Sequence, residues 1–395
     1  MSDRNIYLDN TATNPVLAEV VDAMLPYLKD AYGNPQSMHD WGDAPREGLE
    51  EARQKVADLI GAKDNEIIFT SSGTESNNMA IKGLAMAQQA KGKHIVVSAI
   101  EHFSVLHSVK TLQKLGFEAT EVPVDEYGRV NPDDVKKALR DDTILVSVML
   151  ANGEVGTIQP VKEIAAIVKE AGITIHTDAV AAAGNIPIDV ADLNVDAMSI
   201  AANQFYGPKG AAALYLKKGT RIIPLLDGGI QEGGKRAGTE NVPAIVGMGK
   251  AAELAKEDMD ARGKQLSSIR DRLIKGITGI EHVILSGHPT DRLPHHASFC
   301  VEFIEGESML MLLSSKGVAA SSGSACTSKA LKASHVLTAM GFPPEIAAGS
   351  LVFTIGKSAT DADIDYVIDT LPPIVERLRQ MSPLYGKYLK EQGGK

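Results

Sequence analysis

Short apolar segments alternate with helix-like segments over the first half of the chain, and this alternation most constrains the fold. Five runs rich in Ile, Val and Met have the length of buried strands. Each is followed by a segment with helical or turn-like composition, as in parallel sheets covered by helices. We therefore expect an α/β fold with a mostly parallel sheet and helices on both faces. The runs are EIIFT, HIVVSAI, ILVSVML, ITIHTD and DAMSIAA.

A second, smaller α+β domain is expected after the sheet. A charged helical stretch from about Gly249 to Gly276 leads the chain away, and strand-like HASFCVEF and SLVFTIG follow. We expect residues 17–255 to form the large domain and residues 1–16 with 256–395 to form the small one. DADIDYVIDTLPPIVERLRQM reads as a closing helix bent by prolines, and the tail YGKYLKEQGGK, poor in apolar residues, is expected to be mobile.

Charge and cysteine content exclude several classes of protein. The net charge is −10 and no long Lys/Arg block occurs, which argues against nucleic acid as a partner. Only Cys300 and Cys326 are present, too few for a disulfide framework or a four-thiolate metal site. The sequence contains no apolar run of about 18 residues, so no membrane span is predicted. The first residues also lack the apolar core of a signal peptide. We expect a cytoplasmic protein.

The stretch IIFTSSGTESNNM reads as a strand, a Ser/Gly/Thr-rich turn and a helix that starts near Thr74. Such a turn directs free backbone amides and the positive end of the helix dipole toward one point, which suits a phosphate. Gly73 and Thr74 are the candidate contacts. The alternative is a plain helix start, with Thr74 as the N-cap and Glu75 in the first turn.

Two further side chains stand where open α/β sheets bind ligands. Asp178 ends the apolar strand of HTDAV, and its buried carboxylate needs a cationic partner. A protonated pyridine nitrogen would serve, as in pyridoxal phosphate enzymes, while a local arginine or an Asx turn is the structural alternative. His102 follows the strand HIVVSAI and is placed to stack on such a ring or to be a satisfied turn residue.

Cys326 lies in the Ser/Gly-rich segment ASSGSACTSKALKASHVL, within an expected loop of about residues 320–335. Small polar neighbours predict an accessible thiol, so we favour a reactive role for Cys326. Cys300 lies in the strand-like ASFCVEF and is expected to be an inert, buried residue.

Taken together, these segments resemble the cysteine desulfurases of the class V aminotransferase group, and the resemblance extends over nearly the whole chain. The matching segments are YLDNTATNPV, YGNPQSMH, FTSSGTESNN, SAIEHFSVL, ANGEVGTIQPV, HTDAV, YGPKG, GGKRAGTENVPAIVG, SSGSACTS and MSPLY.

This resemblance implies a homodimeric pyridoxal phosphate fold with an aminotransferase-like, seven-stranded large domain. It also implies an iron–sulfur scaffold or another sulfur-acceptor protein as partner. The implied roles are the phosphate for Gly73 and Thr74, ring stacking for His102, the pyridine nitrogen for Asp178, the neighbouring subunit's phosphate for Thr239, the substrate for Asn34 and Asn152, and the persulfide for Cys326.

The resemblance fails at the residues that carry the cofactor chemistry. Before YGPKG the family has a His-Lys pair whose lysine binds the cofactor covalently and moves the substrate's proton; here the pair is Asn203-Gln204. A carboxamide is neither a reactive amine nor a general base at neutral pH. The family's phosphate-contacting serine is Ala201, its glutamine after HTDAV is Ala181, and its substrate-carboxylate arginine is Val352.

Other lysines do not obviously replace the missing one. The family already has a lysine at the position of Lys209, and Lys235 and Lys357 fall where the family often has arginine. The several coincident changes favour a drifted or repurposed pocket over a single engineered substitution.

Three hypotheses follow. The first is a protein of sulfur transfer or iron–sulfur cluster assembly that acts through Cys326, by accepting sulfur or by lending a thiolate to a transient cluster, with pyridoxal phosphate absent or bound non-covalently. The second is an active desulfurase with non-covalent cofactor. The third is a non-enzymatic binding module that holds a different ligand, or a metal between His102, Asp178 and Cys326.

Overall fold

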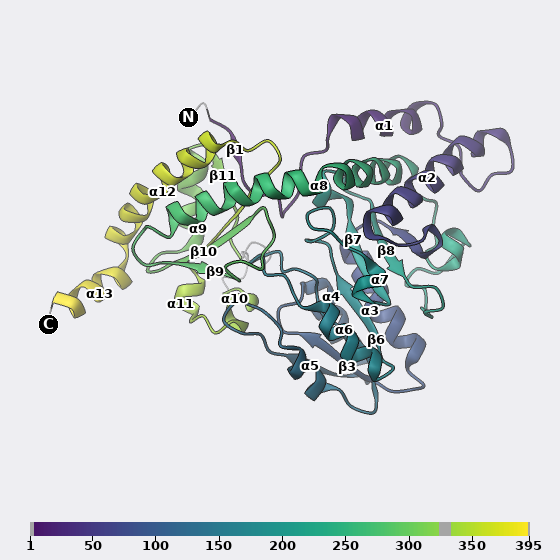
Figure 1. The fold of residues 1–395 in the computed structure, drawn as a ribbon, viewed down its shortest axis with the longest axis horizontal. Coiled ribbons are helices and arrows are strands. Elements are labelled where there is room, and N and C mark those ends of the chain that lie inside the picture. Colours follow the sequence, from purple (N-terminus) through teal and green to yellow (C-terminus); the bar gives the residue numbers. More distant parts are fainter. Residues whose placement is uncertain (1–3, 324–332, 394–395) are drawn as a thin grey trace.

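The computed structural model describes residues 4–323 and 333–393. Figure 1 shows a sheet with helices around it on one side and a smaller group of strands and helices on the other. The long helix α8 (Val242–Ile277) runs between them. The chain therefore has two groups of elements, and one continuous helix extends through both.

The larger unit is built on a seven-stranded sheet in the order β2-β8-β7-β6-β5-β3-β4. Only β8 runs antiparallel to its neighbours β2 and β7, and the other adjacent strands are parallel. The predicted α/β fold with a mostly parallel sheet is confirmed. The strands are β2 (Ile67–Thr70), β3 (His94–Ser98), β4 (Glu118–Val122), β5 (Thr143–Ser147), β6 (Thr174–Asp178), β7 (Ala197–Ala201) and β8 (Ala212–Leu216).

All five predicted runs are strands, but β4 and β8 were not among them. Strand β4 lies at the sheet edge and only its last residue, Val122, is buried, so the sequence EATEV lacks an apolar run. Strand β8 is fully buried. Its sequence AALYL contains small residues that also suit a helix, so composition alone did not identify it.

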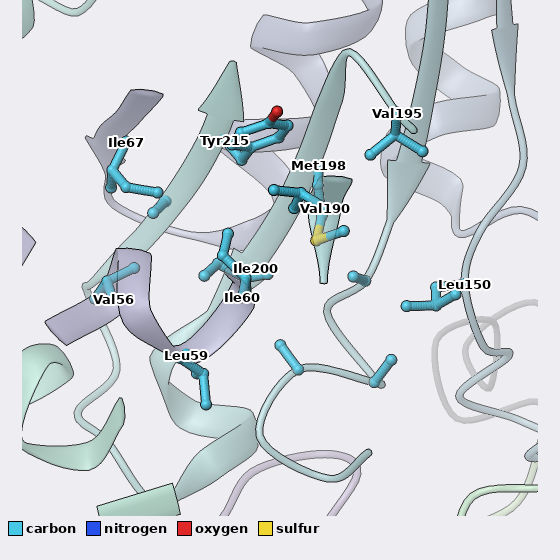
Figure 2. Packing of buried hydrophobic residues seen from close by; sticks show 14 of the residues in the cluster. Val56, Leu59, Ile60, Ile67, Leu150, Val190, Val195, Met198, Ile200 and Tyr215 are labelled. Atoms are coloured by element: carbon cyan, nitrogen blue, oxygen red, sulfur yellow. The ribbon is translucent and has the colours of Figure 1, made fainter. Parts of the chain in front are cut away.

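Helices cover both faces of the sheet because successive strand residues point to opposite sides. In β2, Ile67 and Phe69 join the hydrophobic cluster that also contains residues of α2, α6 and α8, whereas Ile68 joins the cluster of α3 and α4. Figure 2 shows part of the first cluster, with Val56 and Ile60 of α2. The helices of this unit are α1 (Ala18–Lys29), α2 (Asp43–Ile60), α3 (Gly73–Gln88), α4 (Phe103–Lys114), α5 (Pro132–Ala138), α6 (Val161–Glu170) and α7 (Val190–Leu193).

The smaller unit has a three-stranded antiparallel sheet, in the order β12-β10-β9, and a two-stranded parallel pair of β1 with β11. Its core also includes Leu266, Ile269 and Leu273 from the second half of α8. Because α8 continues through residue 255, the expected domain boundary falls inside a helix and stays a prediction. The elements are β1 (Ile6–Tyr7), β9 (Val283–Ser286), β10 (His296–Val301), β11 (Val318–Ala319), β12 (Ser350–Thr354), α9 (Gly306–Ser315), α10 (His335–Ala339), α11 (Pro344–Ala347) and α12 (Asp361–Met381).

The expected mobile tail is instead the helix α13 (Pro383–Gly393). The rings of Tyr385 and Tyr388 lie 5.4 and 4.9 Å from the ring of Phe303, so the tail contributes aromatic surface. The sequence pattern did not reveal this contact because both partners lie far apart in the chain.

Replacing Ile60 tests the core between α2 and the sheet. Ile60 is fully buried, so Ile60→Ala should lower the free energy of unfolding by about 2–5 kcal/mol through lost burial and a residual cavity. Met311, which is 75% exposed, provides the control. Met311→Ala should change the free energy of unfolding by less than about 0.5 kcal/mol. Urea unfolding followed by circular dichroism measures both, and equal effects would contradict the assignment of this core.

Candidate functional site

Asp178 lies at the end of β6, where it joins the neighbouring helices to the sheet. Its Oδ2 accepts a hydrogen bond of 2.6 Å from Asn77 Nδ2 of α3, and its Oδ1 accepts one of 2.9 Å from the Val180 amide. Asn77 Nδ2 also lies 2.8 Å from Ser104 Oγ of α4. Burial raises the pKa of Asp178, against these hydrogen bonds and the influence of His102. The Asx-turn alternative is thus present, and the carboxyl still lacks a cationic hydrogen-bond partner among the described residues.

His102 is the N-cap of α4. Its Nδ1 accepts from the Ser104 amide at 3.2 Å and lies 2.7 Å from Ser104 Oγ. These contacts fix the plane of the His102 ring beyond the carboxyl end of β3. The turn role and a stacking role are compatible, because the capping atom is on one edge and the ring face remains available to a ligand.

The start of α3 differs in detail from the prediction. Ser72, not Thr74, is the N-cap and accepts from the Glu75 amide at 3.1 Å, while the side chain of Thr74 is exposed. Sequence reasoning missed Ser72 because either Ser or Thr suits the position. A Cβ on Gly73 would lie 2.6 Å from Val180 Cγ2, so only glycine lets the helix start approach this strand end.

The first turn of α3 already contains a carboxylate. Glu75 Oε1 accepts 2.8 Å from Arg236 Nε, and its Oε2 accepts 2.8 Å from the Ser71 amide. Burial opposes ionisation of Glu75, but the hydrogen bonds from Arg236 and Ser71 lower its pKa overall. The helix start therefore binds a carboxylate of the chain itself, and the phosphate site stays a prediction.

Gln204 is buried in the short 3-10 helix Ala202–Phe205 after β7. Its Nε2 donates 2.7 Å to the carbonyl oxygen of Thr11, and its backbone carbonyl accepts from Asn14 Nδ2 at 3.1 Å. The carbonyl of Asn203 also accepts from Asn14 Nδ2 at 3.1 Å. Gln204 thus attaches the N-terminal segment to the sheet.

A cavity of about 240 Å³ lies beside these residues. Asn152 lines it and is buried, with Oδ1 accepting from the amides of Glu154 and Val155 at 2.8 and 3.0 Å. Val352 of β12 also lines this cavity and is buried. The cavity therefore lies between the two hydrophobic units, and its walls come from both.

Two buried glutamates that the sequence reasoning did not single out also line this cavity. Burial raises the pKa of Glu101 to about 8, with a hydrogen bond from Ser98 opposing and Asp178 adding to the shift. Burial likewise raises the pKa of Glu154 to about 8, opposed by Ser334. Their only sequence signal was an acid directly after a predicted strand, in SAIEH, and an acid in the turn ANGEVG.

The structure brings only some of the predicted residues together. His102, Asn152 and Val352 line the cavity, and Gln204 reaches it through Thr11. Asn34 and Thr239 are exposed and do not line it. Cys326 lies outside the described residues.

The three candidate lysines lie elsewhere. Lys357 Nζ pairs with Asp258 at 2.7 Å, Lys235 lines a different cavity beside Arg53, and Lys209 is exposed. Among the described residues, no lysine or arginine lines the 240 Å³ cavity. In the same part of the chain, no group of three or more His, Cys, Asp and Glu residues has the arrangement of a metal site.

Comparison with known proteins identifies the family. The model of the class-V aminotransferases matches residues 6–367. The chain belongs to this family. It is 53% identical over 385 residues to the cysteine desulfurase IscS of Methanosarcina thermophila, which covers 98% of the chain and 95% of that relative. It is also 53% identical over 381 residues to the cysteine desulfurase IscS of Dictyoglomus turgidum, with 96% and 97% covered.

Solved structures agree with this class-V aminotransferase membership. A NifS-like protein superposes with a TM-score of 0.89 at 37% identity and covers 95% of this chain and 100% of its own. The predicted resemblance to cysteine desulfurases and the predicted fold are both confirmed. In the described part of this family member, the helices are all too short or too polar to cross a membrane.

The buried glutamates predict how the stability of this class-V family member varies with pH. Between the ordinary value of 4.5 and about 8, folded Glu101 keeps a proton that the unfolded chain releases. Its contribution is therefore complete below pH 4.5 and is lost as the pH rises through 8, at about 1.4 kcal/mol per pH unit. Glu101→Gln keeps the acceptor oxygen but does not titrate, so its stability should fall less between pH 6 and 8.

Urea unfolding at several pH values measures this difference. Glu126→Gln, at an exposed glutamate, is the matched control and should parallel the unchanged protein. A Glu101→Gln curve that also runs parallel would show that Glu101 does not hold the extra proton.

Proposed function

We propose that this protein serves sulfur transfer or iron–sulfur cluster assembly through Cys326 and has little or no ordinary L-cysteine desulfurase activity. The state of Gln204 carries the proposal. Its carboxamide occupies the position that the family resemblance assigns to the cofactor lysine, and it is buried and donates to the Thr11 carbonyl. A neutral amide in that place neither binds a cofactor covalently nor accepts a proton.

Two separate steps of the ordinary reaction should suffer. Loss of a general base costs roughly 10²–10⁴ in rate. Val352 offers no cation to a substrate carboxylate, and loss of a hydrogen bond to a charged group weakens binding by roughly tenfold to a hundredfold. The two losses act on different steps and should roughly multiply if they are independent.

The residues around Asp178 fit a pyridoxal phosphate ring without a covalent bond. Asp178 is a buried carboxyl without a cationic hydrogen-bond partner among the described residues, and Asn77 Oδ1 beside it is buried and also lacks a partner there. When bound, this cofactor acts as an electron sink for carbanion chemistry. Asp178 would hold the ring nitrogen, His102 the ring face, and Gly73 and Thr74 the phosphate, while Ala201 supplies no hydroxyl to it.

Sulfur transfer through Cys326 needs no such cofactor. The Cys326 thiolate attacks the outer sulfur of a donor persulfide, and the donor leaves as a thiolate. An acceptor thiolate then attacks the outer sulfur of the Cys326 persulfide and regenerates the thiol. Each step exchanges one S–S bond for another without net oxidation, so the structure need supply only an accessible thiolate.

We also propose a homodimer that delivers sulfur to a scaffold or acceptor protein. Tyr32, Met38 and Trp41, between α1 and α2, are 67%, 99% and 61% exposed, and such exposed apolar groups suit a protein interface. Thr239 is exposed too, as a contact to a neighbouring subunit requires. A cytoplasmic location is part of the same proposal.

Cys326→Ala tests the proposed route. Transfer of ³⁵S from a small persulfide donor to a scaffold protein, without L-cysteine, should fall to background because the accepting thiol is gone. Cys300→Ala is the matched control, since Cys300 is buried and burial raises its thiol pKa to about 12, and it should transfer normally. Unchanged transfer by Cys326→Ala would refute the proposal.

An active desulfurase with non-covalent cofactor is the second candidate, because Asp178, His102 and the start of α3 are all in place. It would release sulfide from L-cysteine and pyridoxal phosphate faster than free cofactor does. We expect background release from the unchanged protein. Borohydride reduction and mass mapping should find no modified lysine, whereas Gln204→Lys should trap cofactor at position 204. Release well above background by the unchanged protein would favour this second candidate.

A further inference from the structure

The 240 Å³ cavity presents hydrogen-bond acceptors that have no donor in the described residues. Thr11 Oγ1, Glu101 Oε2 and Glu154 Oε1 all belong to residues that line it, and all three atoms are buried without a partner. Buried polar atoms are nearly always satisfied in native proteins, and leaving one without a partner costs about 1–3 kcal/mol. A ligand with N–H donors would satisfy all three oxygens once the two carboxyl groups have released their protons.

In each of the two glutamates, one carboxyl oxygen has no hydrogen-bond partner among the described residues. Glu101 Oε1 accepts from Ser98 Oγ and from the Met149 amide, both at 2.7 Å, which leaves Oε2 as the unused oxygen. Glu154 Oε1 lies so close to Gly323 that a Cβ there would approach it to 1.9 Å. Only glycine at position 323 therefore leaves room for this oxygen at the cavity wall.

The charges in the lining point to the same kind of ligand. Asp9, Glu101 and Glu154 supply three carboxyl groups, and His102 and His335 are the other titratable groups in the described lining. Among the described residues, a carboxylate-bearing ligand would meet no lysine or arginine in the lining, and its charge would hold the glutamates in their protonated form. A cation would instead lower the pKa values of Glu101 and Glu154, so that each carboxyl can release its proton and pair with the bound charge.

We propose that this cavity binds a small amine or amidine cation that carries no carboxylate. The ammonium N–H groups donate to Glu101 Oε2, Glu154 Oε1 and Thr11 Oγ1. A metal ion is the weaker alternative, because the described residues contain no group of three His, Cys, Asp or Glu arranged to hold one. The family resemblance indicates that Val352 replaces an arginine. This replacement weakens the binding of a carboxylate ligand, and it also changes the preferred ligand to a cation.

Three compounds with a common two-carbon chain test the proposal by isothermal titration calorimetry of the full chain under reducing conditions. Cysteamine carries a thiol and an ammonium, 3-mercaptopropionate a thiol and a carboxylate, and ethanolamine an ammonium without a thiol. Cysteamine and ethanolamine should each bind at one saturable site, and about tenfold or more tightly than 3-mercaptopropionate. Equal or tighter binding of 3-mercaptopropionate, or no saturable binding of either amine, would overturn the proposal.

Glu154→Gln identifies the atoms involved. This variant keeps the shape of the side chain but removes the charge, so it should weaken ethanolamine binding by about tenfold. The exposed Glu126→Gln is the control and should bind as before. Unchanged affinity in Glu154→Gln would show that the amine binds elsewhere, including on any bound aldehyde cofactor. The measurement uses no sulfur donor, so its failure would leave the proposed route through Cys326 untouched.

Discussion

The hydrogen bond from Asn77 to Asp178 is the contact on which the arrangement of the site depends. Through it, one amide group connects α3, α4 and the end of β6. Asn77 Nδ2 donates this bond of 2.6 Å to Asp178 Oδ2, and the donated hydrogen bond lowers the cost of burying the carboxyl group. His102 and Gly73 stand at the starts of α4 and α3, the two helices that this amide connects.

Local sequence predicted the parts of the fold that local physics determines. The buried strands were visible as apolar runs, and the closing helix α12 was visible despite Pro372 and Pro373 because its apolar spacing continues past them. The edge strand β4 and the tail helix α13 were missed. Both depend on partners distant in the chain, which no window of sequence contains.

The residues of the candidate site likewise fall into those that the sequence could predict and those that it could not. Asp178 and His102 could be proposed from their places after strands, and the altered positions Gln204 and Val352 could be proposed from the family resemblance. Glu101 and Glu154 could not, because an acid after a strand is unremarkable until tertiary structure removes water from it. The same holds for Thr11, whose hydroxyl is a buried acceptor only in the assembled cavity.

The continuity of α8 has a mechanical consequence. Its 36 residues contribute Met248 and Met259 to the core under the sheet and Leu266 and Leu273 to the other core, without an intervening loop. Domains joined by flexible linkers open by hinge rotation at little cost, but here a large rotation would have to bend a helix or break packing at one of its ends. The two walls of the cavity should therefore behave as parts of one stiff frame. Ligand exchange then depends on small local adjustments at the rim and not on the swinging apart of two lobes.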